Sequence, residues 1–162
     1  MGIEIERKFL LTNNKWEKDA EGIYYCQGYI PTINNTTVRV RIAGDIGFIT
    51  VKSSIVGFTR KEFEYEIPLE DAKSMLHLLC SKPLIEKKRY KIPYKNKIWE
   101  VDVFERENKG LIFAEIELQS ETESFEKPEW IGKEVTGDMK YCNSNLVKYP
   151  FSQWQECEKE GL

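Results

Sequence analysis

Charged side chains recur at every second position in several segments of this chain, with spacings that could hold a metal ion and an anion. The first segment is Glu4-Ile5-Glu6-Arg7-Lys8, in which two carboxylates and an amine alternate with other residues. Alternate side chains of a β-strand point to the same face, about 6.6 Å apart, so two such carboxylates can reach one metal ion or two adjacent ions. Ligand sets made only of oxygen favour Mg²⁺ or Mn²⁺ over zinc.

The two-residue period continues in later segments and sorts their residues into an ionic face and an apolar face. Carboxylates and cations on the ionic face come from largely separate segments. The acidic members are Glu4, Glu6, Glu62, Glu64, Glu100, Asp102, Glu115 and Glu117. The basic members are Lys8, Arg39, Arg41, Lys52, Lys87 and Arg89. Several arginine forks and lysine amines on opposed walls match a linear polyphosphate better than a single phosphate.

Two structural interpretations of the ionic face are open at this point. Half-buried antiparallel strands with solvated outer faces are the ordinary case. A closed barrel with a polar lumen, its apolar outside covered by helices, is the alternative that the nearly uniform charge favours. Cations inside such a lumen need neutralisation by the carboxylates or by a bound polyanion, because an unpaired buried charge is costly.

The elements that would position these residues are mostly strands. Period-two alternation predicts strands over 3–10, 23–30, 37–43, 47–54, 60–67, 86–93, 98–105 and 112–119. Short, turn-rich joints predict hairpins and mainly antiparallel pairing. Amphipathic patterns predict helices over 69–82 and 138–148, the second capped by Asp138, and no role is predicted for the tail from Phe151 onward. The expected fold class is α+β, an antiparallel barrel of about eight strands with a few helices packed outside, in one domain over 1–162.

Composition argues against several classes of function. The chain has 24 lysines and arginines against 27 acidic residues and a net charge of −3, which argues against general nucleic-acid binding. No apolar run approaches the roughly 18 residues that span a bilayer, and the charged N-terminus is unlike a signal peptide. We therefore expect a cytoplasmic protein that binds a small polyphosphate and no membrane. The oligomeric state is not predicted.

With these residues collected, the sequence resembles the CYTH superfamily, the triphosphate tunnel metalloenzymes. The family signature Glu-x-Glu-x-Lys stands at residues 4–8, and later segments follow in the family's order, from "VRVRI" at 38–42 to "AEIEL" at 114–118. The resemblance covers nearly the whole chain. It implies an antiparallel tunnel that binds a triphosphate group and a divalent metal, Mg²⁺ or Mn²⁺. The short bacterial members, which this chain most resembles, act as inorganic triphosphatases.

The resemblance also implies a role for each matching residue. Phosphate oxygens would be contacted by Lys8, Arg39, Arg41, Lys52, Lys87 and Arg89. Metal would be held by Glu4, Glu6, Glu115 and Glu117, with Asp102 ligating directly or through water and Glu62 and Glu64 in a supporting role. Tyr29 stands where some members use a tyrosine, so Lys8 and Tyr29 would help to place or activate the attacking water. A further hypothesis is that cationic neighbours lower the pKa of Lys8.

Other functions share the same features. Class IV adenylate cyclases, thiamine triphosphatases and RNA triphosphatases use a similar tunnel, because the fold and motif fix the anionic end of the substrate better than its organic end. A non-catalytic polyphosphate-binding module would keep the cations but could lose the carboxylates, and both Glu-x-Glu pairs are intact here. A purely structural charged barrel would bind no ligand tightly. Arg7, on the opposite face of its strand, has no predicted role.

Overall fold

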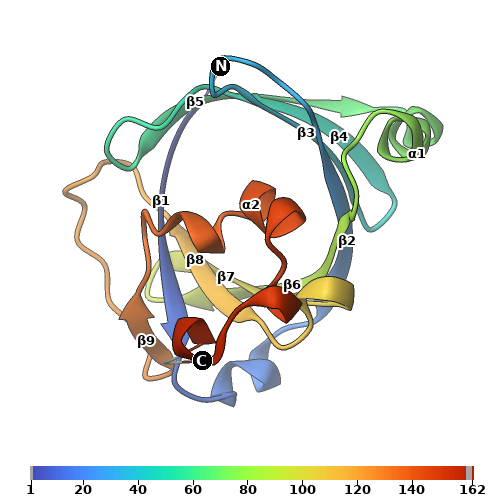
Figure 1. The fold of residues 1–162 in the computed structure, drawn as a ribbon. Helices are drawn as coiled ribbons and strands as arrows, with labels where there is room; N and C mark the ends of the chain where they lie inside the picture. The colour runs from blue at the N-terminus through green and yellow to red at the C-terminus, as the bar shows by residue number, and fades with distance from the viewer. Residues whose placement is uncertain (1, 160–161) are drawn as a thin grey trace.

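The strands close into a barrel in the structure of the protein, a computed structural model that describes residues 2–159 and 162 (Figure 1). The strands are β1 (Gly2–Leu11), β2 (Gly22–Ile30), β3 (Thr37–Ala43), β4 (Ile46–Lys52), β5 (Thr59–Ile67), β6 (Ile85–Tyr94), β7 (Lys97–Phe104), β8 (Ile112–Glu117) and β9 (Ile131–Glu134). Every predicted strand is present, with ends that differ by a few residues. The short β9 was not predicted, because four residues give too little alternation to recognise.

β1 closes the barrel. The strands follow the order β5-β4-β3-β2-β6-β7-β8-β1, and β5 pairs again with β1. The first half of β1 pairs with β5 from Gly2 to Ile5, and the second half pairs with β8 from Glu6 to Phe9, both antiparallel. β9 extends the sheet beyond β1, where Phe9 pairs with Glu134. The predicted closed antiparallel barrel and the α+β class are confirmed.

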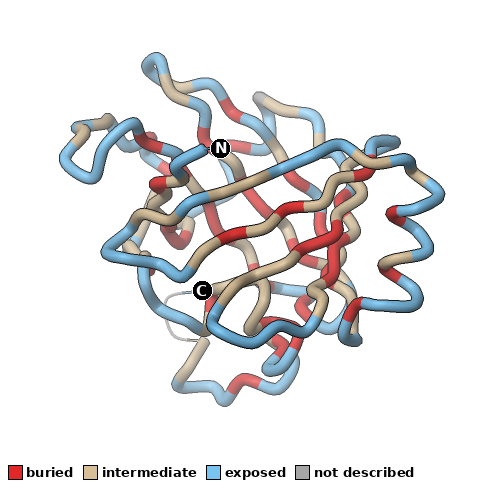
Figure 2. The backbone as a smooth tube through the Cα atoms, turned by 90° about the horizontal axis from the view of Figure 1, so that it is seen from above, coloured by how far each residue is buried: buried red, intermediate tan, exposed pale blue. Residues whose placement is uncertain are grey.

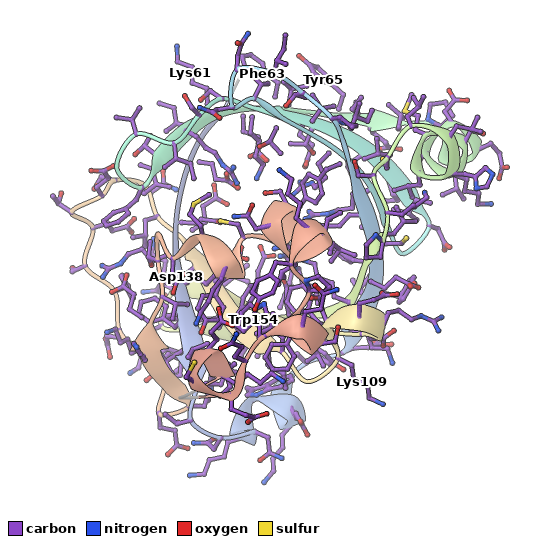
Figure 3. The ribbon with its side chains drawn as sticks, in the orientation of Figure 1. Lys61, Phe63, Tyr65, Lys109, Asp138 and Trp154 are labelled. Carbon is purple, nitrogen blue, oxygen red and sulfur yellow. The ribbon has the colours of Figure 1, made fainter. Side chains whose placement is uncertain are left out.

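Apolar residues lie on the outside of this barrel, as the two-residue period predicts. Lys61, Phe63 and Tyr65, at alternate positions of β5, point away from the barrel in Figure 3. Buried positions follow the strands, whereas the turns at the strand ends are exposed (Figure 2). The largest outer cluster is centred on the fully buried Trp99 and includes Trp16 of the 3-10 helix η1 (Lys15–Asp19).

Helix α1 (Leu69–Leu78) packs outside the barrel, as predicted. Its buried residues Ala72 and Leu76 contact the outer face of β3 around Val40. The helix ends at Leu78, four residues before the predicted end, and Pro83 accounts only for the last of these residues, because proline disfavours helical backbone at the residue before it. Tyr65 on the outer face of β5 stays 61% exposed, so helical cover reaches only part of the apolar outside.

The C-terminal part of the chain lies across one end of the barrel. It contains the helix α2 (Asn143–Lys148) and the 3-10 helices η3 (Met139–Tyr141), η4 (Phe151–Gln153) and η5 (Glu156–Lys159). The 3-10 helix η2 (Arg106–Asn108) precedes β8 and contacts η4. In the end-on view of Figure 1, α2 overlaps the opening of the ring, and residues of α2 such as Asn143 and Val147 line the barrel cavity. The predicted helix over 138–148 is thus a 3-10 turn followed by a short α-helix, and Asp138 accepts the hydrogen bond expected of a cap from the Lys140 backbone.

None of the helices in the described residues has the length and hydrophobicity that crossing a bilayer requires.

Candidate active site

A cavity of about 1280 Å³ occupies the barrel interior. Its lining comes from β1 to β8 and from the segment that leads into α2. The predicted site residues that line it are Glu4, Glu6, Lys8, Tyr29, Arg39, Arg41, Lys52, Glu62, Glu64, Arg89, Glu115 and Glu117. Lys87 and Asp102 are fully buried and do not line it. The part of the interior that these residues line is therefore a polar chamber, whereas the end beneath the C-terminal segment is packed with apolar side chains such as Ile85, Phe104 and Phe113.

Closure of the barrel gathers the charges into two walls. The acidic strands β7, β8, β1 and β5 become consecutive neighbours around the ring, and the basic strands β4, β3 and β6 occupy the other side together with β2. The segregation of charge by segment in the sequence thus becomes a carboxylate wall that faces a cation wall. A linear anion with a bound cation matches this distribution of charge.

The cation wall is centred on Arg39, Arg41 and Arg89. Burial, with Arg39 and Arg89 nearby, lowers the pKa of Arg41 to about 10. Burial of like charges this close together is unfavourable unless an anion offsets it. The buried Nε of Arg39 has no hydrogen-bond partner among the described residues. Both observations fit an anion with several oxygen atoms.

The carboxylate wall is centred on Glu6, which lies directly across from Glu117 in the pairing of β1 with β8. Burial, with Glu115 and Glu4 nearby, raises the pKa of Glu6 to about 8. Burial and the neighbouring Glu4 and Glu62 also raise the pKa of Glu117. Carboxylates that repel one another and offer only oxygen fit a hard divalent cation, which would neutralise them.

The carboxylates are not gathered around one point, however. No group of three or more His, Cys, Asp or Glu side chains in the part of the chain that the structure describes could hold a metal ion as it stands. Glu4 accepts hydrogen bonds from Lys52 Nζ at 2.7 Å and from Arg60 Nε at 2.6 Å. Burial alone would raise the pKa of Glu4, but these two cations lower it. Metal binding would therefore require Glu4 to leave its cationic partners.

Lys8 is almost fully buried between the carboxylate wall and the C-terminal segment. Its Nζ donates to the Tyr141 carbonyl oxygen at 2.9 Å and lies 3.6 Å from Glu115 Oε1. Burial acts to lower the pKa of Lys8, but Glu115 and Glu6 outweigh burial and raise it. The hypothesis of a lowered pKa is wrong, because the nearest charges are carboxylates. No hydrogen bond joins Lys8 to Tyr29, which belongs to β2 and lies across from Arg39 of β3.

Lys87 and Asp102 form a buried pair behind Arg89. Asp102 accepts from Lys87 Nζ at 2.6 Å and from Arg89 Nε at 2.7 Å. Burial, with Arg89 and Arg41, lowers the pKa of Lys87 to about 7 against the opposing effect of Asp102. Asp102 thus holds the guanidinium of Arg89, and neither Lys87 nor Asp102 lines the cavity.

Glu62 and Glu64 lie beside cations of the opposite wall. Glu64 Oε2 accepts from Arg39 at 3.1 Å and from Thr50 Oγ1 at 2.7 Å, and Glu62 lies 3.4 Å from Lys52 Nζ. The two carboxylates therefore orient cation side chains at the boundary between the walls.

Polar residues of the site that were missed from the sequence include Arg60, Thr50, Gln27 and Asn143. Arg60 shares the period of Glu62 and Glu64, so that signal was present and could have found it. Thr50 and Gln27 also point inward but are uncharged, and a search for ionic faces passes over them. Asn143 follows a 3-10 turn, where no strand period applies.

The CYTH domain family matches residues 2–148. An inorganic triphosphatase of Acetivibrio thermocellus is 50% identical over 156 residues, which covers 96% of this chain and 100% of the relative. An inorganic triphosphatase of Nitrosomonas europaea is 34% identical over 149 residues, covering 89% and 96%. The crystal structure of an inorganic triphosphatase superposes with a TM-score of 0.64 at 31% identity, covering 88% of this chain and 96% of that one.

Proposed function

The chain belongs to the CYTH domain family, and from that premise we propose that it is a divalent-metal-dependent triphosphatase acting on inorganic tripolyphosphate, with nucleoside triphosphates as further substrates. One observation carries the proposal, namely that a wall of arginines faces a wall of carboxylates across one cavity. The triphosphate would lie against the first wall and the metal against the second. The names of the two relatives at 50% and 34% identity favour hydrolysis over the cyclase alternative.

The residues that would hold Mg²⁺ or Mn²⁺ are Glu4, Glu6, Glu115 and Glu117. When bound, the metal supplies electrostatic stabilisation of the charge that builds up on the phosphoryl group. Asp102 is assigned a different role from the one the family resemblance implies. Because it already neutralises Lys87 and Arg89 and has no face on the cavity, we assign it to orienting Arg89.

The chain's own residues supply the rest of the mechanism. Arg39, Arg41 and Arg89 would bind phosphate oxygens through their guanidinium groups, with Lys52 at the boundary between the walls. Lys8 would act as a cation and hydrogen-bond donor, because its Nζ already donates to the Tyr141 carbonyl oxygen and lies beside Glu115. Catalysis would then rest on positioning and charge stabilisation while water attacks the terminal phosphorus in line.

The decisive experiment measures phosphate release from tripolyphosphate, ATP and thiamine triphosphate with Mg²⁺ or Mn²⁺. We expect release from tripolyphosphate, and loss of about a hundredfold or more in Glu6→Gln, which removes a metal ligand. Glu126→Gln, on an exposed segment outside the cavity, serves as the matched control and keeps full activity. A folded Glu6→Gln variant with normal activity contradicts the proposal, and cyclic AMP formed from ATP would identify a cyclase.

A binding measurement separates the enzyme from a purely structural barrel. A ligand at a hundredfold its dissociation constant stabilises a protein by about 2.7 kcal/mol. Tripolyphosphate with Mg²⁺ is therefore expected to raise the unfolding temperature. Binding without turnover would identify a polyphosphate-binding module instead.

A further inference from the structure

Two side-chain amides, those of Gln27 and Asn143, connect the cation wall to the C-terminal segment. Gln27 points into the barrel from β2, is fully buried, and lies across from Arg41 on the neighbouring strand. Its Oε1 accepts from Arg41 Nε at 2.9 Å, and its Nε2 lies 2.8 Å from the Tyr29 hydroxyl oxygen and 3.3 Å from Asn143 Oδ1. Asn143 Oδ1 also lies 3.0 Å from Lys87 Nζ.

The guanidinium of Arg41 fixes the orientation of both amides. A guanidinium only donates hydrogen bonds, so Gln27 must turn its oxygen toward Arg41 and its NH₂ group the other way. That NH₂ group has two hydrogens, and the Tyr29 hydroxyl and Asn143 Oδ1 are the two acceptors within reach. Asn143 must therefore turn its oxygen toward Gln27, which leaves its own NH₂ group facing away.

This chain of hydrogen bonds determines what the Tyr29 hydroxyl can do. Its oxygen accepts from Gln27, and the hydroxyl donates no hydrogen bond to any of the described residues. Tyr29 lines the cavity, so its hydrogen is available to a bound ligand. Burial raises the pKa of Tyr29, so the phenol keeps its proton at neutral pH. These properties suit a donor to a phosphate oxygen and do not suit a base.

Asn143 presents a second donor in the same way. Asn143 lines the cavity, and its Oδ1 is already occupied by Gln27 and Lys87. The free amide hydrogens therefore belong to Nδ2, which makes no hydrogen bond with the described residues. The C-terminal segment thus adds a neutral donor to a site whose other donors are cations.

We propose that Gln27 is a positioning residue that, through its bonds to Arg41, Tyr29 and Asn143, holds the Tyr29 hydroxyl and the Asn143 amide as hydrogen-bond donors to the bound triphosphate. The inference rests on the proposed function, because it needs a triphosphate in the cavity. It assigns Tyr29 to anion binding and charge stabilisation instead of water activation. It also gives residue 27 a role that no ionic pattern could have indicated.

The test is a double-mutant cycle on binding of tripolyphosphate, measured by calorimetry without divalent metal so that no turnover intervenes. Gln27→Glu keeps the size of the side chain but offers a carboxylate, which takes the Tyr29 hydrogen for itself. We expect about tenfold weaker binding for Tyr29→Phe. Gln27→Glu is expected to weaken binding at least fivefold more when Tyr29 is present than in the Tyr29→Phe background, because only the former has a donor to lose.

Two further variants keep the test decisive. Gln27→Met completes the same cycle if Gln27→Glu does not fold. Asn108→Asp alters a buried amide whose Oδ1 accepts from the Phe151 backbone, outside the cavity, and is expected to lower stability while leaving tripolyphosphate affinity unchanged. Equal weakening by the Gln27 substitution in both backgrounds, or no binding of tripolyphosphate, overturns the inference. Intact coupling with no phosphate release from the unaltered protein overturns the triphosphatase proposal alone.

Discussion

Arg7 and Glu134 form a two-point ion pair that joins β1 to β9. Arg7 Nε lies 2.6 Å from Glu134 Oε1, and its terminal nitrogen lies 2.6 Å from Oε2. The pair gives a structural role to Arg7, for which the first motif predicted none. It holds the second half of β1, which carries Lys8, from the outside of the barrel.

The Arg7–Glu134 pair is expected to make stability depend on acid pH. Hydrogen bonds from Arg7 hold the pKa of Glu134 below its usual value of 4.5. A depressed pKa contributes stability above the unfolded-state value, and this contribution is lost as pH falls through the folded-state value. We expect Glu134→Gln to cost about 1 kcal/mol in urea unfolding at pH 7, with the difference vanishing well below pH 4.

Glu129→Gln is the control for this measurement. It removes an ion pair with Lys15 whose side chains are 59% and 67% exposed, so no change in stability is expected. A Glu134→Gln deficit that persists unchanged in acid would contradict a role for the charge.

Glu6→Gln is expected to stabilise the metal-free protein while removing activity. Glu6 forms no ion pair within the described residues, and burial with Glu115 and Glu4 nearby raises its pKa to about 8. At pH 7 folding must therefore protonate this carboxylate, a cost that a neutral amide avoids. We expect the unfolding temperature to rise by about 2–4 °C without metal. Added Mg²⁺ is expected to stabilise the unaltered protein more than the variant, and the reverse order would argue against Glu6 as a ligand.

Asp102→Asn is expected to destabilise the fold strongly. Asp102 is the buried partner of both Lys87 and Arg89, so its loss removes the carboxylate that stabilises the charged form of Lys87 and one of the carboxylates that hold Arg89. Breaking a buried pair in this way costs about 3–5 kcal/mol. Chemical unfolding at pH 7 measures the loss, and Glu117→Gln, on the exposed part of the cavity wall, is the comparison. Similar stability of the two variants would indicate that Asp102 is a ligand rather than a buried counter-charge.

Lys8→Arg is expected to lower the rate without changing the shape of the pH–rate profile. Lys8 stays a cation because Glu115 and Glu6 raise its pKa, and arginine keeps that charge. The larger guanidinium cannot keep the bond to the Tyr141 carbonyl in the same geometry, so a loss of about tenfold or more is expected. A profile that loses one limb would show that Lys8 acts as an acid or base after all.

Trp154→Ala tests whether the tail supports the site. Trp154 is buried and packs edge-on against Tyr141, with ring centroids 5.3 Å apart, and the Tyr141 carbonyl binds Lys8. We expect about 3–5 kcal/mol lower stability and a lower rate for tripolyphosphate even at temperatures where the variant is folded. Ile33→Ala, at a side chain that is 83% exposed, is the control and leaves both unchanged.

The strands could be predicted because one simple pattern repeats in all of them. Lys61, Phe63 and Tyr65 point outward as their spacing requires, and the carboxylates between them face inward. The pattern does not say which strands become neighbours. β1 changes its partner strand halfway along, so Glu4 faces Arg60 of β5 whereas Glu6 faces Glu117 of β8. The alternation of residues along β1 does not indicate this change.

The roles of inward-facing side chains that do not line the cavity could not be predicted from the sequence. Lys87 and Asp102 fit the ionic period as well as any other residue, yet they neutralise each other out of reach of the cavity. The pKa of Lys8 is raised rather than lowered for a similar reason, because the sequence shows which charges exist but not which of them are adjacent. Gln27 and Asn143 meet through the final packing of the C-terminal segment, which no local pattern describes.

The position of β1 as the strand that closes the ring has a consequence for the order of folding. β1 is synthesised early, but its partners on β8 and β9 emerge last, and Arg7 is separated from Glu134 by 127 positions in the chain. Contacts between such distant residues form slowly, because a long loop must close before they repay its entropy. The ring cannot close without β8, so a chain that lacks this strand has neither the closed barrel nor Glu115 and Glu117 of the carboxylate wall.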